Sequence, residues 1–158
     1  MNNLFKISDK DYIPFHSFSM KWRFTDPKYN VLPKKELMQV RPLTKKTSFH
    51  LHQYTIAFFK NFQLDIDQFE SIEKLETPYE NFLIMEWLWS KIPEENKKII
   101  ISWDNENSVV TNRKIFCKYW DDFCYPGSDD VIIMSFDGKW LMHYFHGDQF
   151  QMGKLKKE

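Results

Sequence analysis

The sequence predicts an α+β fold, in which an antiparallel sheet of about four to five strands carries three to four helices. Two apolar runs, 131–136 and 139–146, flank Asp137-Gly138, a dipeptide typical of two-residue β-hairpin turns of type I′. Other segments place apolar residues three and four positions apart, which indicates amphipathic helices. A chain of 158 residues is most simply one domain, 1–158, with room for a substantial core.

The predicted hairpin is apolar on both faces. Side chains alternate along a strand, and the two-residue turn pairs Ile133 with Met142 and Ile132 with His143. One face carries Ile132, Met134, Phe136, Leu141, His143 and Phe145, and the other carries Val131, Ile133, Ser135, Trp140, Met142 and Tyr144. A hairpin with one solvated face would show polar residues there. We therefore expect both faces to be covered by helices, by further strands or by a second copy of the chain.

The first part of the chain is predicted to contain one strand and one short helix. The strand covers 18–24, because apolar and polar residues alternate there. Its apolar positions are Phe18, Met20, Trp22 and Phe24. Pro33 suits the first turn of a helix, which we expect over 34–40, ending before Pro42.

Two longer helices are expected next. Helical spacing predicts the first over 44–62, although two lysines near its start favour a later beginning capped by Ser48. Residues 62–76 fit a strand in part and a helix in part, so the sequence leaves them open. The second helix runs over 78–91 with Thr77 as its cap. Its apolar stripe consists of Phe82, Met85, Leu88 and Ile92, flanked by Trp87 and Trp89.

The second half is expected to contain a strand, a helix, the hairpin and a final strand. The strand covers 99–103, and the helix begins after Ser108 and ends near Cys124, where a Pro-Gly pair follows. After the hairpin, the last strand places Phe150 and Met152 on one side.

The composition argues against several classes of function. The 22 basic and 22 acidic residues cancel, which argues against a general binder of nucleic acid or of anionic membranes. No apolar run reaches about 18 residues, and the N-terminus lacks the features of a signal peptide, so a cytoplasmic protein is expected. Cys117 and Cys124 are seven positions apart, too far for a disulfide on a helix, and we expect them to be reduced core thiols.

No catalytic residue, metal site or cofactor is predicted. His143 and His146 point to opposite faces of a strand, unless that strand ends or bulges at Phe145. A helix C-terminus raises the pKa of a thiol, which makes Cys124 a poor nucleophile. The four glycines form no phosphate-binding loop. Two pairs of carboxylates fit solvated capping and turn positions better than acid–base chemistry, namely Asp121-Asp122 and Asp129-Asp130.

The surplus of aromatic residues is the remaining signal, since they make up 18% of the chain. They form either one large aromatic core or, on the face with Trp140, Met142 and Tyr144, a contact surface or an apolar pocket. We expect a non-enzymatic binding module whose aromatic sheet face docks a protein partner or a second copy in a homodimer, as in a toxin-neutralising immunity protein. The alternative is a small-ligand-binding protein or enzyme, with a pocket lined by Trp140, Tyr144, His146, Asp148 and Trp103.

Two sets of short motifs also stand out. The first set is Tyr12-Ile13-Pro14, Trp22-Arg23-Phe24 and Leu37-Met38-Gln39-Val40-Arg41-Pro42-Leu43, and the second is Trp103-Asp104-Asn105, Phe116, Trp120-Asp121-Asp122-Phe123 and Asp129-Asp130. Together they resemble a family of small uncharacterised bacterial proteins, known as a domain of unknown function. The resemblance implies a bacterial cytoplasmic protein of the accessory-gene kind. It implies no activity and no catalytic residues.

Overall fold

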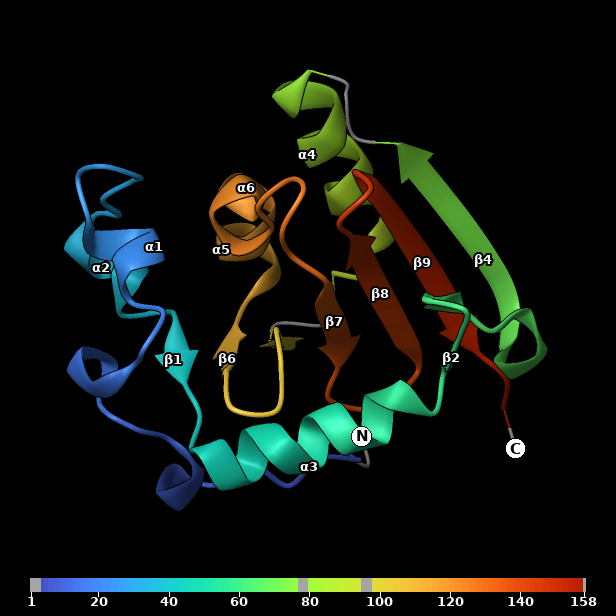
Figure 1. The fold of residues 1–158 in the computed structure, drawn as a ribbon, viewed down its shortest axis with the longest axis horizontal. Helices are drawn as coiled ribbons and strands as arrows, with labels where there is room; N and C mark the ends of the chain where they lie inside the picture. Colours follow the sequence, from blue (N-terminus) through green and yellow to red (C-terminus); the bar gives the residue numbers. More distant parts are fainter. Residues whose placement is uncertain (1–3, 77–79, 95–97, 158) are drawn as a thin grey trace.

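The computed structural model describes residues 4–76, 80–94 and 98–157, which form one large antiparallel sheet with helices on both faces (Figure 1). The strand order is β1-β6-β5-β7-β8-β9-β4. The α+β class is confirmed. Within the described residues, however, this sheet has seven strands where four to five were predicted, and there are six α-helices where three to four were predicted.

The bounds of the elements define the architecture. The strands of the large sheet are β1 Arg41–Pro42, β4 Phe69–Glu76, β5 Ile99–Ser102, β6 Ser108–Thr111, β7 Val131–Ser135, β8 Trp140–Phe145 and β9 Gln149–Leu155. A separate hairpin is formed by β2 Phe59–Lys60 and β3 Gln63–Leu64. The α-helices are α1 Trp22–Thr25, α2 Lys34–Leu37, α3 Lys45–Ile56, α4 Asn81–Lys91, α5 Arg113–Lys118 and α6 Trp120–Phe123. Short 3-10 helices cover Asp9–Asp11, Phe15–Ser17 and Ile66–Gln68.

The hairpin of β7 and β8 has the predicted register but not the predicted turn. Ile133 pairs with Met142, and Ile132 pairs with His143. A type I′ turn needs two consecutive residues with positive φ. Among residues 136–139, which connect the strands, only Gly138 has a positive φ, at 68°. The register survives because this longer connection adds one residue to each side of the expected turn.

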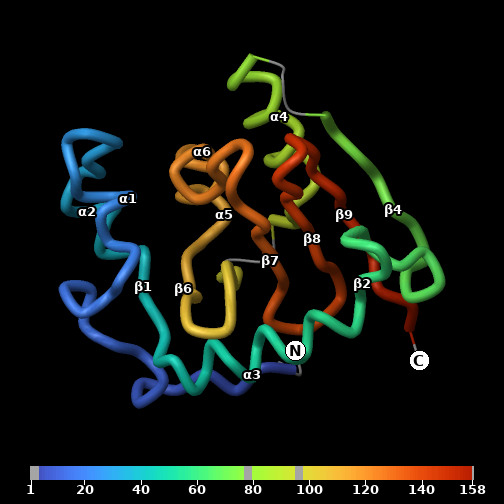
Figure 2. The backbone as a smooth tube through the Cα atoms, in the orientation of Figure 1, coloured from blue at the N-terminus to red at the C-terminus, as the bar shows by residue number. Residues whose placement is uncertain are grey.

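Both faces of this hairpin are covered by the chain itself, as its apolar pattern predicts. The face carrying Ile133 and Met142 packs against α1, α4, α5 and α6. The face carrying Ile132 and Leu141 packs against α3, the N-terminal segment and the β2–β3 hairpin. In Figure 1, α3 crosses the lower part of the view, while α4, α5 and α6 gather in the upper part. Figure 2 shows the N-terminal segment running close to α3, where the rings of Phe5 and Tyr54 meet at 5.1 Å.

The strand predicted over 18–24 is wrong. The backbone instead turns after Phe18 and forms α1 from Trp22 to Thr25. Phe18 and Phe24 are nevertheless buried, and Phe24 packs its ring 4.9 Å from that of Phe123. The alternation of apolar residues therefore reflected burial without an extended backbone.

The helix predicted from Ser108 begins later. Residues 108–111 form β6, because they pair with β5, and Asn112 then caps α5 by accepting a hydrogen bond from the backbone N–H of Ile115. The later part of the prediction corresponds to α5 and α6. Ser108 lies in the interior instead, and its Oγ is 2.6 Å from the Oγ of Ser48.

The region between α3 and α4 contains the hairpin and an edge strand. Thr44 caps α3 by accepting from the N–H of Thr47, so the earlier of the two predicted starts is right. The helix ends at Ile56 and not near residue 62, and the open segment 62–76 supplies β3 and β4. The predicted cap at residue 77 lies outside the described residues.

Candidate functional site

Polar side chains interrupt the apolar α3 face of the sheet along one cross-strand row. The register places Ser108 beside Ser102, Ser102 beside Ile132, and Ile132 beside His143. Gln151 continues the row on β9. The four polar members of the row are buried, and buried polar groups are costly unless they find partners. Yet Oγ of Ser102 and Nδ1 of His143 have no hydrogen-bond partner among the described residues.

Beside this row lies a concavity of about 610 Å³, which we call the histidine cleft. It is bordered by the second half of α3, the β2–β3 hairpin and the ends of β5 and β7. Its lining residues are His52, Ile56, Phe59, Asn61, Phe62, Trp103, Asp130, Ile132 and His143. The lining is mainly aromatic and aliphatic with a few polar groups, which is the composition of small-molecule sites.

His143 is the most deeply buried polar group of the cleft. Burial lowers the pKa of its imidazole to about 4, although the nearby Asp130 carboxylate opposes this effect. The ring is therefore neutral at pH 7. The ring of Phe59 meets it edge-on at 4.7 Å, which fixes its orientation. His143 therefore contributes an uncharged imidazole to the wall of the cleft.

Asp130 joins two histidines at the mouth of the cleft. Its Oδ1 lies 3.0 Å from Nδ1 of His146 and 3.9 Å from Nε2 of His143. The backbone N–H of His146 also donates to this carboxylate at 3.2 Å. Strand β8 ends at Phe145, which is the exception under which both histidines can approach one group. Within residues 4–76, 80–94 and 98–157, however, no set of three or more potential ligands could hold a metal ion.

The β2–β3 hairpin forms a strained rim of the cleft. Asn61 and Phe62 both have positive φ, 52° and 62°, as a type I′ turn requires. A bulky side chain is rare in this conformation, and Phe62 is also 79% exposed. The side chain of Gln151 anchors the hairpin to the sheet, because its Oε1 accepts from the N–H of Leu64 at 3.0 Å. Strain held by a rigid support is typical of binding sites.

The predicted contact surface of Trp140, Met142 and Tyr144 is wrong for this fold. Trp140 is 3% exposed, and the other two side chains are fully buried. They lie under α4, α5 and α6 in the larger core, where Tyr144 packs 4.9 Å from Phe150. These three residues thus follow the alternative prediction of one large aromatic core.

The residues of the predicted pocket separate in the structure. Trp103 lines the histidine cleft, and its Nε1 donates to the backbone oxygen of Phe123 at 2.8 Å. His146 reaches the cleft only through Asp130. Asp148 accepts a hydrogen bond from the Tyr144 hydroxyl at 3.2 Å and does not line the cleft. The sequence analysis did not assign His52, Phe59 and Asp130 to a pocket, because the cleft forms between segments that are distant in the chain.

The predicted solvated carboxylates also behave differently from one another. Asp129 is partly buried in a bidentate ion pair, with its oxygens 2.6 and 3.0 Å from the guanidinium of Arg23. Asp122 is buried and accepts from Asn30, and burial raises the pKa of its carboxyl. Asp122 thus differs from the predicted solvated residue, whereas Asp129 also accepts from the backbone N–H of Tyr125 at 2.8 Å, in the turn role predicted for it. The two cysteines are buried and free, as predicted, and burial raises the pKa of each thiol.

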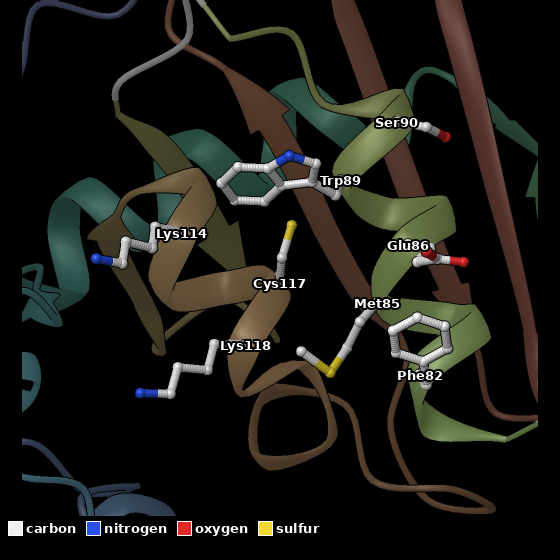
Figure 3. Close-up of a pocket in the computed structure, with 8 residues that line it drawn as sticks. All are labelled: Phe82, Met85, Glu86, Trp89, Ser90, Lys114, Cys117 and Lys118. Carbon is white, nitrogen blue, oxygen red and sulfur yellow. The ribbon is translucent and has the colours of Figure 1, made fainter.

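A second concavity, the α4–α5 groove, is almost wholly apolar. Its volume is about 480 Å³ (Figure 3). Its lining residues are Phe82, Met85, Glu86, Trp89, Ser90, Lys114, Cys117 and Lys118. Figure 3 shows Trp89 and Met85 reaching from α4 toward Cys117 on α5. The predicted α4 stripe is right for Leu88 and Ile92, which are in the core, and for Met85, which packs against it. It is wrong for Phe82, which is 62% exposed, and it omits the buried Ile84.

Comparisons with known proteins assign no family to this chain. No protein-family model matches the chain, and no curated protein matches it. The resemblance to a bacterial family therefore stays a prediction. In the part of the chain that the structure describes, no helix has the length and apolar character needed to cross a membrane.

Proposed function

We propose that this protein binds a small, flat molecule in the histidine cleft and holds its hydrogen-bond-donating head against Asp130. The observation that carries this proposal is the half-exposed carboxylate of Asp130 at the mouth of a largely apolar cavity of ligand size. The side chains of His52 and His143 also line the cleft, although Nδ1 of each is buried and not exposed at its surface.

The apolar walls select the body of the ligand. Small-molecule sites range over about 300–1,000 Å³, and the cleft, at about 610 Å³, falls within this range. Phe59, Phe62 and Trp103 supply aromatic surface from two sides of it. Aromatic side chains favour flat guests that stack or meet them edge-on.

The charge at the mouth selects the head of the ligand. Asp130 is an acceptor, and its side chain is about half exposed, so it remains reachable beside His146. The neutral His143 adds no positive charge to the interior at pH 7. An amidinium or amide that offers two N–H groups fits a carboxylate in this position, because two parallel hydrogen bonds form. An anionic head of the same shape would be repelled.

Benzamidine and benzoate test this proposal as a matched pair, because they share a ring but carry opposite charges. We expect benzamidine to bind in isothermal titration calorimetry at pH 7 and benzoate to give no heat. Asp130→Asn should weaken benzamidine binding at least tenfold, which corresponds to about 1.4 kcal/mol. Asp121→Asn, at an exposed carboxylate elsewhere, should leave it unchanged. Equal binding of the two compounds, or an unaffected Asp130→Asn variant, would contradict the proposal.

A second function, self-association, is favoured by the α4–α5 groove. Trp89 is held from one side by Arg113, whose guanidinium carbon lies 3.9 Å from the centre of the indole, and the rest of its ring stays exposed. Lys114 lies on the α5 rim and Glu86 on the α4 rim of the same groove. A two-fold axis across the groove would give both copies the same basic and acidic rims, because such interfaces are self-complementary. The predicted homodimer is therefore proposed at this groove.

Light scattering tests the homodimer. We expect the mass of a dimer for the native chain and of a monomer for Trp89→Glu, which places a charge at the groove. Phe49→Glu, at an exposed aromatic on α3, serves as the control and should keep the dimer mass. A native chain that remains monomeric at high protein concentration would remove this second function.

A further inference from the structure

Lysines gather in a third concavity, at the end of the sheet where β8 begins and β9 ends. We call it the lysine pocket, and its volume is about 450 Å³. Five lysines line it, namely Lys91, Lys139, Lys154, Lys156 and Lys157. The only carboxylates in its lining, among the described residues, are Glu70 and Asp137. Because acidic and basic residues cancel over the whole chain, this is a local excess of positive charge.

The positive charge of the pocket is only partly compensated. Lys139 pairs with Asp137 at 3.1 Å, and Lys91 pairs with Glu73. The ammonium groups of Lys154 and Lys157, by contrast, form no ion pair or hydrogen bond with another described residue. Like charges within a Debye length of about 8 Å repel one another, and a concave surface of low dielectric constant strengthens their field. An anion in the pocket would relieve this repulsion.

The floor of the pocket is apolar. Trp140 and Met152 line it from β8 and β9, and both side chains are almost completely buried. The register pairs Trp140 with Lys154, so this lysine rises beside the indole on the same face of the sheet. Pro93, which follows α4, adds further apolar surface. A rim of cations above an apolar floor fits a molecule with an anionic part and an organic part.

Protection of the sheet edge does not account for these lysines. Lysines that discourage edge-to-edge pairing lie along an edge strand. The edge strand beside the pocket is β4, which contributes Glu70 to the lining, whereas Lys139 and Lys154 adjoin or belong to the internal strands β8 and β9. The cluster therefore marks the pocket and not the edge.

We propose that the lysine pocket binds a small organic molecule that carries two or more phosphate groups. The phosphates lie among the lysines, which bind them as point charges, and the organic part covers Trp140 and Met152. The sequence has no glycine-rich loop, so lysine side chains and not backbone amides carry the recognition. The site is independent of the histidine cleft, because Trp140 and His143 belong to opposite faces of β8.

Calorimetric titrations with ADP, inorganic pyrophosphate and adenosine test the ligand class. ADP and pyrophosphate should bind in 50 mM NaCl, and both affinities should fall several-fold in 200 mM NaCl, because salt screens the lysines. Adenosine, which lacks phosphate, should not bind. Adenosine binding as tightly as ADP would overturn the proposal. A single-stranded oligonucleotide that binds where pyrophosphate does not would overturn it as well.

A matched pair of double variants tests the location. Lys154→Gln with Lys157→Gln should weaken ADP binding at least tenfold, since it removes the two uncompensated charges. Lys28→Gln with Lys45→Gln removes the same charge from exposed positions elsewhere and should leave the affinity unchanged. Far-UV circular dichroism confirms that both double variants are folded. Equal affinity of the two double variants for ADP would overturn the assignment.

Discussion

The two faces of the large sheet are covered in different ways. On one face, α1, α4, α5 and α6 seal a continuous apolar core. On the other, one long helix, a two-stranded hairpin and the N-terminal segment leave the histidine cleft between them. The same strands supply both faces, because side chains alternate along them. The polar residues Ser102 and His143 belong to the second face, and His143 lines the cleft.

The sealed face owes its closure to aromatic rings from separate elements. Phe123 of α6 lies at the centre of this arrangement. Its ring is 4.9 Å from that of Phe24 on α1, 5.6 Å from that of Phe116 on α5 and 6.2 Å from that of Trp103. The cleft face has Phe59 in a comparable position, but that side chain is only half-buried. An aromatic residue on the sealed face should therefore contribute more to the free energy of unfolding than one on the cleft face.

The largest expected effect is that of Phe123→Ala. Removing a fully buried phenylalanine costs about 3–5 kcal/mol, because apolar burial is lost and a cavity remains. Phe59→Ala on the cleft face should cost clearly less. Urea unfolding monitored by circular dichroism gives both values. If the two substitutions lowered the free energy of unfolding equally, the proposed difference between the faces would be wrong.

The next effect concerns acid stability and His143. Its pKa is about 4 in the folded protein and ordinarily 6.5, so between these values the unfolded chain binds a proton that the folded protein does not. The free energy of unfolding should therefore fall as the pH falls through this window, by up to about 3 kcal/mol. His143→Gln should lose less stability between pH 7 and pH 4.5 than the native chain loses. His146→Gln, at the exposed rim, is the control and should behave like the native chain; equal acid sensitivity of all three proteins would refute the prediction.

The smallest effect concerns the rim of the cleft. Phe62→Gly creates the Asn-Gly pair that type I′ turns favour and relieves the positive φ of Phe62. It should raise the free energy of unfolding by about 0.5–1 kcal/mol. Phe62→Ala removes the same ring but keeps the strained backbone, so it should give no gain in the same urea experiment. A gain from alanine as large as that from glycine would show that ring exposure, and not backbone strain, is what matters.

Much of the fold was predictable where one segment carries its own pattern. The faces of the β7–β8 hairpin follow from alternation, and its register follows from the position of Asp137-Gly138. The prediction failed where distant partners decide the structure. Ser108 resembles a helix cap, yet pairing with β5 makes it part of a strand. Apolar and polar residues alternate over 18–24, yet this segment packs against α6 and forms turns and a helix.

The candidate site was less predictable than the fold. The sequence places His143 on a hairpin face that is expected to be covered, and a strand end at Phe145 allows both histidines to approach one group, but nothing in it predicts the carboxylate that they share. Asp130 precedes β7, whereas the histidines belong to β8 and the turn after it. The cleft also needs α3 and the β2–β3 hairpin, whose approach depends on tertiary packing and leaves no pattern in any one segment.

The position of β4 at the end of the sheet has a consequence for synthesis of the chain. Its partner is β9, so residues 69–76 have nothing to pair with until residues 149–155 have been made. At about 5–20 residues per second, the ribosome needs on the order of 4–15 s to cover that distance. Phe69 and Leu75 lack the neighbouring strand β9 during this interval. The charged Glu70, Glu73 and Lys74 lie between them. Hydration of these side chains opposes the association of one nascent chain with another.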